Sequence, residues 1–274
     1  MKGRLINEGN TAEVFEWGDQ KIIKLFREGF PVHAIEVEYK ISKEVEKQGL
    51  PVPKVGEMVD IDHRKGIIYE RIYGDSMLHQ IMKNPLSAKR YAKHLADIHY
   101  EIHQCKVKNL ENYKDNLTWS IRETALLSNE NKQSVLDLLE QLPEGDRLCH
   151  ADFHPGNIIV GKKQTIILDW MTASVGNPAA DVARTILLLE NGELPKETPE
   201  IIIKIITILR RRIAKVYRKR YLQISKIKGE AIDKWRVPIA AARLSEWIPE
   251  SEKKLLLQIV EDNCTFTSFV SDIK

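Results

Sequence analysis

Apolar and polar positions alternate along roughly the first seventy residues in the way that β-strands do, with one helical stretch among them. The segment AEVFEWGDQKIIKLF (12–26) holds two β-prone runs joined by a Gly-Asp turn and predicts a hairpin. AIEVEYKISKEVEKQ (34–48) has apolar residues at helical spacing and stops at Gly49, which predicts a helix. KGIIYERIYG (65–74) predicts a further strand.

Helical spacing dominates from about Ser76 onward, apart from a strand-rich island at 147–169. The helical segments are residues 87–105, 115–142 and 197–225, and two more helices are expected after Gly229. We therefore predict an α+β fold with a small β-rich lobe over residues 1–73 that binds a nucleotide. A larger, mainly helical lobe over residues 74–274 would carry the catalytic β-hairpin and the acceptor site.

Composition indicates a soluble globular protein. The 274 residues are 43% hydrophobic and 30% charged, and the formal net charge of +3 is too small to indicate nucleic-acid binding. The three cysteines lie far apart and are typical of reduced thiols. The N-terminus lacks a signal-peptide-like apolar stretch, and no apolar run is long enough to span a bilayer. We expect a cytoplasmic protein without a nucleic-acid or membrane partner.

The island contains the residues that suggest chemistry. Asp152 precedes Asn157 by five positions, and Asp169 follows twelve positions later at the end of an apolar strand. Phosphoryl transfer needs a carboxylate to orient and deprotonate the attacking hydroxyl, and an amide and a second carboxylate to hold Mg²⁺. The protein-kinase pattern H-R-D-x-x-x-x-N followed by D-F-G has the same Asp-to-Asn spacing. The island therefore favours a kinase-like reaction.

Two other interpretations of the island remain open. His150, Asp152 and His154 alternate along an extended segment, as the ligands of a metal-dependent hydrolase could. That interpretation leaves Asn157 and Asp169 without a role. A polar loop that merely caps a hairpin is the second alternative, and it does not account for the lobe-like N-terminal half.

The N-terminal half supplies the other parts that a kinase needs. Gly9, Asn10 and Thr11 lie between two predicted strands, where a loop could cover the phosphates. Lys24 lies on a strand between apolar residues, and Glu38 and the nearby Glu36 on the following helix compete as its partner, a choice that the family resemblance described below decides in favour of Glu38. Each feature alone is more often structural. Their order along one chain makes the combination specific.

These residues resemble the aminoglycoside phosphotransferase/choline kinase family, whose catalytic stretch reads H-G-D-x-H-x-x-N. This chain has HADFHPGN, with Ala151 in place of the usual glycine. The resemblance extends through GLPVPKV, ILDW and GNPAADVART and implies a protein-kinase-like fold. It implies that Asp152 is the catalytic base, that Asn157 and Asp169 hold Mg²⁺, and that Lys24, held by Glu38, contacts the nucleotide phosphates.

The resemblance also implies several supporting roles. The backbone of Glu70 and Ile72 would meet the adenine edge, with Tyr69 behind the base. Asp181 would brace the catalytic loop through its backbone, and His150 would support the site. ATP or GTP would be the phosphoryl donor, and Mg²⁺ the metal.

The acceptor is expected to be a small molecule with a hydroxyl group, such as an aminoglycoside, an amino alcohol or a sugar. No arginine precedes Asp152, and the chain after Asp169 has no room for a long activation segment, so a protein substrate is disfavoured. Acidic residues that could attract a polycation include Glu190, Glu193, Glu246, Glu250, Glu252, Glu261 and Asp262. The basic run 210–220 suggests either an anion-attracting wall or a solvated helix face. The alternative function is that of a nucleotide-binding pseudokinase or scaffold.

Overall fold

The computed structural model divides the chain into two compact units. It describes residues 2–9, 11–161, 164–191 and 199–271. The first unit consists of Met1–Pro85 and Pro155–Ala173, and the second of Leu86–His154 and Ser174–Lys274. The chain thus passes from the second unit back into the first between His154 and Pro155, inside the catalytic stretch. We describe each unit by itself.

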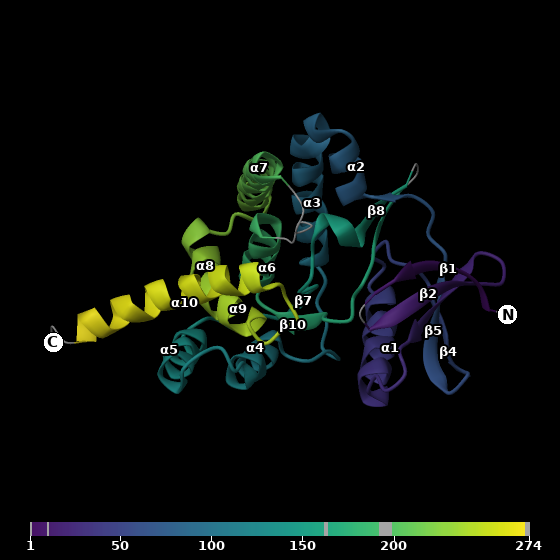
Figure 1. The fold of residues 1–274 in the computed structure, drawn as a ribbon, viewed down its shortest axis with the longest axis horizontal. Coiled ribbons are helices and arrows are strands. Elements are labelled where there is room, and N and C mark those ends of the chain that lie inside the picture. Colours follow the sequence, from purple (N-terminus) through teal and green to yellow (C-terminus); the bar gives the residue numbers. More distant parts are fainter. Residues whose placement is uncertain (1, 10, 162–163, 192–198, 272–274) are drawn as a thin grey trace. The chain divides into compact units, whose positions relative to one another are not determined.

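The first unit contains a five-stranded antiparallel sheet (Figure 1). Its strands are β1 (Lys2–Glu8), β2 (Ala12–Trp17), β3 (Lys21–Phe26), β4 (Val55–Ile61) and β5 (Arg64–Glu70). They are ordered β1-β2-β3-β5-β4. The turn between β2 and β3 contains Gly18 at φ 59°, a left-handed conformation that glycine adopts without a steric penalty.

The alternation of side chains along β3 decides which residues face the helix. Leu25 belongs to an apolar cluster on one side of the sheet, with Phe15 and Ile68. Phe26 belongs to the opposite cluster, together with Ile35 of helix α1 (Val32–Glu46). Because side chains alternate between the two faces, Lys24 points to the same side as Phe26, toward α1. This places a lysine beside a helix rather than in solvent.

Residues 155–173, which include the later part of the predicted island, belong to the first unit. Their elements are the 3₁₀ helix η2 (Pro155–Asn157) and the strands β8 (Ile158–Val160) and β9 (Thr165–Ile167), which pair with each other and with β6 (Asp75–Ser76). Helix α2 (Met77–Lys83) follows β6. The Ile167 N–H donates to the Pro51 carbonyl at 2.9 Å, which ties the island to the segment that follows α1.

The second unit is built mainly of helices. They are α3 (Ala88–Ile102), preceded by the 3₁₀ helix η1 (Pro85–Ser87), α4 (Tyr113–Glu123), α5 (Asn129–Glu140), α6 (Pro178–Glu190), α7 (Glu200–Ser225), α8 (Gly229–Asp233), α9 (Arg236–Arg243) and α10 (Glu250–Ser271). Strands β7 (Arg147–Cys149) and β10 (Ser174–Gly176) form an antiparallel pair. Ten of the thirteen residues of α6 are buried, so this helix forms the centre of the unit. Asn177 caps it by accepting the Ala179 N–H at 2.9 Å.

The structure confirms the α+β fold class, the hairpin over 12–26, the helix over 34–48 and a strand over 65–74. The two helices expected after Gly229 are α9 and α10, and the short α8 begins at Gly229 itself. The compact units also cut the chain differently from the predicted lobes of 1–73 and 74–274. The functional division at residue 73 stays a prediction.

Candidate active site

A pocket of about 280 Å³ lies within the first unit. Its wall contains predicted site residues from four separate segments, namely Lys24, Glu38, Tyr69, Asn157 and Asp169. Strand β3 supplies the first, α1 the second and β5 the third, while the last two come from the ends of the β8–β9 hairpin. The pocket therefore gathers residues that are more than a hundred positions apart in the sequence.

An ion pair joins β3 to α1 at the edge of this pocket. Lys24 Nζ lies 2.7 Å from Glu38 Oε1 and 3.8 Å from Asp169 Oδ1. Glu38 follows Ile35 by one helical turn, so the face of α1 that packs on the sheet also presents this carboxylate. Burial raises the pKa of Glu38 above its usual range, although Lys24 opposes the shift by its charge and hydrogen bond. Glu38 is only 4% exposed, so its ionised form depends on the charge and the hydrogen bond of Lys24.

Tyr69 extends this polar cluster on the pocket wall. Its hydroxyl lies 3.1 Å from Ser42 Oγ and donates to Glu38 Oε1 at 3.4 Å. Burial raises the pKa of Tyr69 well above 10, so the phenol stays neutral and can act as a donor. The ring lies between the strand and α1, so one wall of the pocket combines an aromatic surface with a charged pair.

Asn157 and Asp169 are brought together by the short hairpin between them. The Leu168 N–H donates to the Asn157 carbonyl at 2.8 Å, which fixes the two ends of the hairpin side by side. Asp169 has a φ of 58°, in the left-handed region that carboxylate and amide residues tolerate better than most. The chain therefore turns away from β9 at Asp169, the residue whose carboxylate lies near Lys24.

The other predicted cofactor residues do not line the described pocket. Gly9 and Thr11 belong to a turn between β1 and β2, in which the Gly9 N–H donates to the Ala12 carbonyl at 2.9 Å. Asn10 lies outside the described residues. A Cβ built on Gly9 would meet its nearest atom at 3.6 Å, so sterics do not require glycine there.

Glu70 is the last residue of β5, the strand that carries Tyr69, and Ile72 lies two positions beyond it. The Glu70 N–H donates to the Lys54 carbonyl at 2.9 Å, within the sheet. Neither residue is part of the described pocket wall, so their predicted contact with adenine stays a prediction.

Apart from Asn7, Ser42 and Gly156, the rest of the pocket wall is apolar, and the sequence interpretation did not assign these apolar residues. They are Val14, Ile22, Val45, Val52, Pro53, Val55, Leu168 and Trp170. A signal was present for some of them. Ile22 lies two positions before Lys24 and therefore on the same face of β3. The stretch GLPVPKV contains three more of these apolar residues, Val52, Pro53 and Val55. An apolar slot beside a charged cluster can take a flat ring and a polyanion together.

The second unit holds Asp152 in a loop that follows β7. Asp181, in the first turn of α6, accepts the backbone N–H groups of His150 at 2.5 Å and Ala151 at 3.0 Å. Ala151 has a φ of 60°, which costs about 1–2 kcal/mol in an L-residue. The Asp152 N–H donates to His150 Nδ1 at 3.3 Å. The loop is thus held in an unusual conformation by a buried carboxylate.

Charges around Asp152 favour its ionised form. Burial acts to raise its pKa, but the interaction with His154, whose Nε2 lies 3.7 Å from Oδ2, and the charge of Arg184 outweigh burial. The pKa of Asp152 therefore lies below its usual range, and the carboxylate is unprotonated at neutral pH. Such a group can accept a hydrogen bond from a hydroxyl at once.

Arg184 belongs to a buried ion-pair network that the sequence interpretation had only partly foreseen. Its Nη1 donates to Glu246 Oε1 at 2.6 Å, and Arg243 Nη1 donates to Glu246 Oε2 at 3.0 Å. The second guanidinium nitrogen of Arg243 reaches Glu252 at 2.5 Å. Spacing along one helical turn had indicated only the pair of Arg243 and Glu246. The contacts with Arg184 and Glu252 join separate helices.

The geometry disfavours a metal-dependent hydrolase. Among the residues that the structure describes, one group of three or more His, Cys, Asp or Glu side chains is close enough to share a metal, and it consists of His99, His103 and Asp181. His150 and His154 are not part of it. His150 is fully buried, and its Nδ1 accepts the Asp152 N–H.

Comparison with known proteins agrees with these features. The model of the phosphotransferase enzyme family matches residues 2–204. None of the curated proteins compared with the sequence matches it. Within the described part of the chain, no helix combines the length and the apolar character needed to cross a membrane.

Solved structures show the same fold at low sequence identity. An amicoumacin kinase in complex with AMP-PNP, Ca²⁺ and Ami is 15% identical, with a TM-score of 0.63 over 96% of this chain and 88% of the other. A thermostable mutant of the aminoglycoside phosphotransferase APH(4)-Ia, in a ternary complex with AMP-PNP and hygromycin B, is 12% identical, with a TM-score of 0.66 and coverages of 96% and 92%. The ADP-bound aminoglycoside phosphotransferase APH(2'')-Ib is 16% identical, with a TM-score of 0.59 and coverages of 95% and 91%.

Proposed function

The chain belongs to the phosphotransferase enzyme family, and from that premise we propose that it transfers the γ-phosphoryl group of ATP to a hydroxyl group of a small molecule. One observation carries the proposal above all. A single pocket brings the Lys24–Glu38 ion pair together with Asn157 and Asp169, next to an apolar slot. These are the groups needed to hold a nucleotide and its phosphates.

The pocket's two parts match the two parts of ATP. The apolar residues would enclose the adenine ring, and Lys24 would contact the phosphates while Glu38 holds its side chain in place. The apolar residues could enclose the guanine of GTP as well as adenine, so the binding experiment below decides between the two nucleotides.

Asn157 and Asp169 suit Mg²⁺ because they offer an amide oxygen and a carboxylate, the hard oxygen ligands that this ion prefers. Bound there, Mg²⁺ would neutralise charge on the phosphates. Asp169 already lies 3.8 Å from the Lys24 ammonium, so the side chain contributes negative charge at the phosphate end of the pocket.

Asp152 would orient the acceptor hydroxyl and take its proton. Its carboxylate is ionised, and Asp181 fixes the backbone immediately before it. Because phosphoryl transfer asks for little covalent chemistry from the protein, positioning supplies most of the rate.

Three of the acidic residues that could attract a polycationic acceptor are already paired with arginines, and Glu193 lies outside the described residues. Glu246 and Glu252 bind Arg184 and Arg243, and Glu190 lies 2.9 Å from Arg236. A polycation would have to compete with these arginines. We therefore expect a neutral sugar or an amino alcohol to be a better acceptor than an aminoglycoside, and a panel of the three classes tests this.

Thermal stability with ATP, GTP or no nucleotide, with and without Mg²⁺, tests the nucleotide site. At a ligand concentration of 100 Kd, binding to the folded state adds about 2.7 kcal/mol. We expect a Mg²⁺-dependent gain with ATP that Asp169→Ala loses. The absence of any gain in the unmodified protein would overturn the proposed nucleotide site.

Turnover then separates an enzyme from a scaffold. ADP release from Mg·ATP should fall by about 10²–10⁴-fold in Asp152→Asn, as loss of a general base usually produces, while nucleotide binding persists. Nucleotide binding without any Asp152-dependent ADP release, across the acceptor panel, would favour the pseudokinase alternative.

A further inference from the structure

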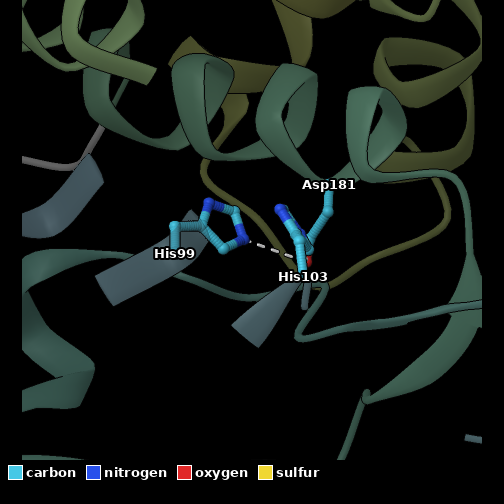
Figure 2. Close-up of side chains that lie close together, drawn as sticks. All are labelled: His99, His103 and Asp181. Atoms are coloured by element: carbon cyan, nitrogen blue, oxygen red, sulfur yellow. Dashed lines mark hydrogen bonds and ion pairs between the residues drawn. The ribbon is translucent and has the colours of Figure 1, made fainter. Parts of the chain in front are cut away.

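His99 of α3 and His103, the residue directly after this helix, converge on the carboxylate that holds the catalytic loop. His99 Nε2 lies 3.0 Å and His103 Nε2 3.3 Å from the same oxygen, Asp181 Oδ2 (Figure 2). All three side chains are at most 2% exposed. His99 and His103 are four positions apart, so they lie on the same side of α3 and its C-terminal end.

Two tyrosines on α7 complete this arrangement. The Tyr217 hydroxyl lies 2.6 Å from His99 Nδ1, and the Tyr221 hydroxyl lies 2.6 Å from His103 Nδ1. The tyrosines are also four positions apart, so α3 and α7 present matching pairs at the same helical spacing. The result is two Tyr–His chains that end on Asp181.

The protonation states of these groups determine which atom donates and which accepts in each hydrogen bond. Burial lowers the pKa of His99 to about 3, so its imidazole is neutral and carries one N–H. Burial acts to raise the pKa of Asp181, but His99 and His103 outweigh it, and the pKa lies well below its usual value. Since the ionised carboxylate can only accept, the imidazole proton lies on Nε2, and Nδ1 accepts the tyrosine O–H.

Asp181 thereby receives four donors. Two are the histidine Nε2–H groups, and two are the backbone N–H groups of His150 and Ala151, directly before Asp152. We propose that Tyr217–His99 and Tyr221–His103 are positioning pairs, which lock Asp181 as a fourfold acceptor and so hold the backbone that presents Asp152. This inference rests on the proposed role of Asp152 in phosphoryl transfer.

The same three side chains could be mistaken for a metal site, because their ligand atoms lie within 4.8 Å of one another. A nitrogen that carries a proton cannot bind a metal, and both Nε2 atoms are within hydrogen-bond distance of Asp181. Structural zinc sites use four ligands, and the described residues supply three here. The hydrogen-bonded network uses every polar atom of the cluster without an added ion.

Tyr217→Phe and Tyr221→Phe test the proposal in the full-length protein. Each removes one hydroxyl and leaves the ring in place. Tyr91→Phe is the matched control, because Tyr91 is a buried tyrosine of α3 outside the network. We expect each network variant to lower kcat for ADP release from Mg·ATP by about tenfold, the equivalent of one hydrogen bond. The KM for ATP and the control variant should stay unchanged.

A conservative replacement separates positioning from packing. His99→Gln keeps an N–H group toward Asp181, whereas His99→Leu keeps only bulk. We expect His99→Gln to retain several-fold more kcat than His99→Leu. Equal losses in the two variants, or an unchanged kcat in both tyrosine variants, would overturn the positioning role.

Two readouts do not depend on activity. Nitrogen-15 NMR of the imidazoles should show His99 and His103 as Nε2–H tautomers, and hydrogen exchange of the His150 and Ala151 amides should accelerate in the tyrosine variants. Nδ1–H tautomers, unchanged exchange, or stoichiometric zinc in the purified protein would each refute the network. If the unmodified protein binds ATP but releases no ADP, the proposed function fails while these two readouts still decide the network.

Discussion

Replacing Lys24 by methionine should make the stability of this protein depend on pH in a defined way. The side chain keeps its length but loses its charge, so Glu38 loses the partner 2.7 Å away. Breaking a buried ion pair by removing one member usually costs about 3–5 kcal/mol. Here the carboxyl group can take up a proton instead, and the cost then depends on pH.

The sign follows from the direction of the shift. Burial already raises the pKa of Glu38 above 4.5 in the folded protein, and removal of Lys24 takes away the two interactions that oppose burial. A carboxyl group with a raised folded pKa contributes stability that is fully present below the unfolded pKa and is lost as pH rises through the folded pKa. The variant should therefore lose more stability than the wild type as pH rises from 5 to 8.

The magnitude has an upper bound. One proton changes the free energy of unfolding by at most about 1.4 kcal/mol per pH unit, or about 4.1 kcal/mol over the three units from pH 5 to pH 8. Urea unfolding of wild type and variant at pH 5, 6, 7 and 8, followed by tryptophan fluorescence, measures the difference. The double variant Lys24→Met/Glu38→Gln should remove the added pH dependence. A constant difference between Lys24→Met and wild type, or a pH dependence that survives Glu38→Gln, would refute the reasoning.

Three further substitutions test the packing of the second unit. Trp235 is 1% exposed and Trp247 is 88% exposed, so alanine should cost about 3–5 kcal/mol at the first position and less than about 0.5 kcal/mol at the second, measured by urea unfolding. Equal costs at the two tryptophans would contradict the assignment of Trp235 to the core. Asn177→Ala removes the cap of α6 and should lower the free energy of unfolding by about 1–2 kcal/mol, and an unchanged melting temperature would show that the cap is dispensable.

Local patterns predicted the local parts of this fold well. The alternation in 12–26 and the helical spacing in 34–48 each depend on neighbouring residues, and both elements appear where expected. The order of strand and helix indicated a glutamate partner for Lys24, and the family resemblance selected Glu38 over Glu36, which the ion pair confirms. Side-chain alternation on β3 then explains why this lysine turns toward α1.

The missed features depend on contacts between distant segments. β10 has three residues, and it is a strand because it pairs with β7. The two Tyr–His pairs need α3 and α7 side by side, about 118 positions apart in sequence, and a single buried histidine has no pattern that reveals its partner. Likewise, the contact of Arg184 with Glu246 joins α6 to the end of α9 across 62 positions.

The assignment of residues 155–173 to the first unit has a consequence for synthesis of the chain. Domains generally fold as units while the N-terminal part leaves the ribosome first. Here the nucleotide pocket needs Asn157 and Asp169, which are made after the sheet and after helices α3, α4 and α5 of the second unit. The β8–β9 hairpin, which pairs with β6 and whose Ile167 N–H donates to the Pro51 carbonyl, is therefore added to the first unit only after those helices have been made. A gene truncated after residue 85 would encode the five-stranded sheet and α1 but neither of the two residues that are proposed to hold Mg²⁺.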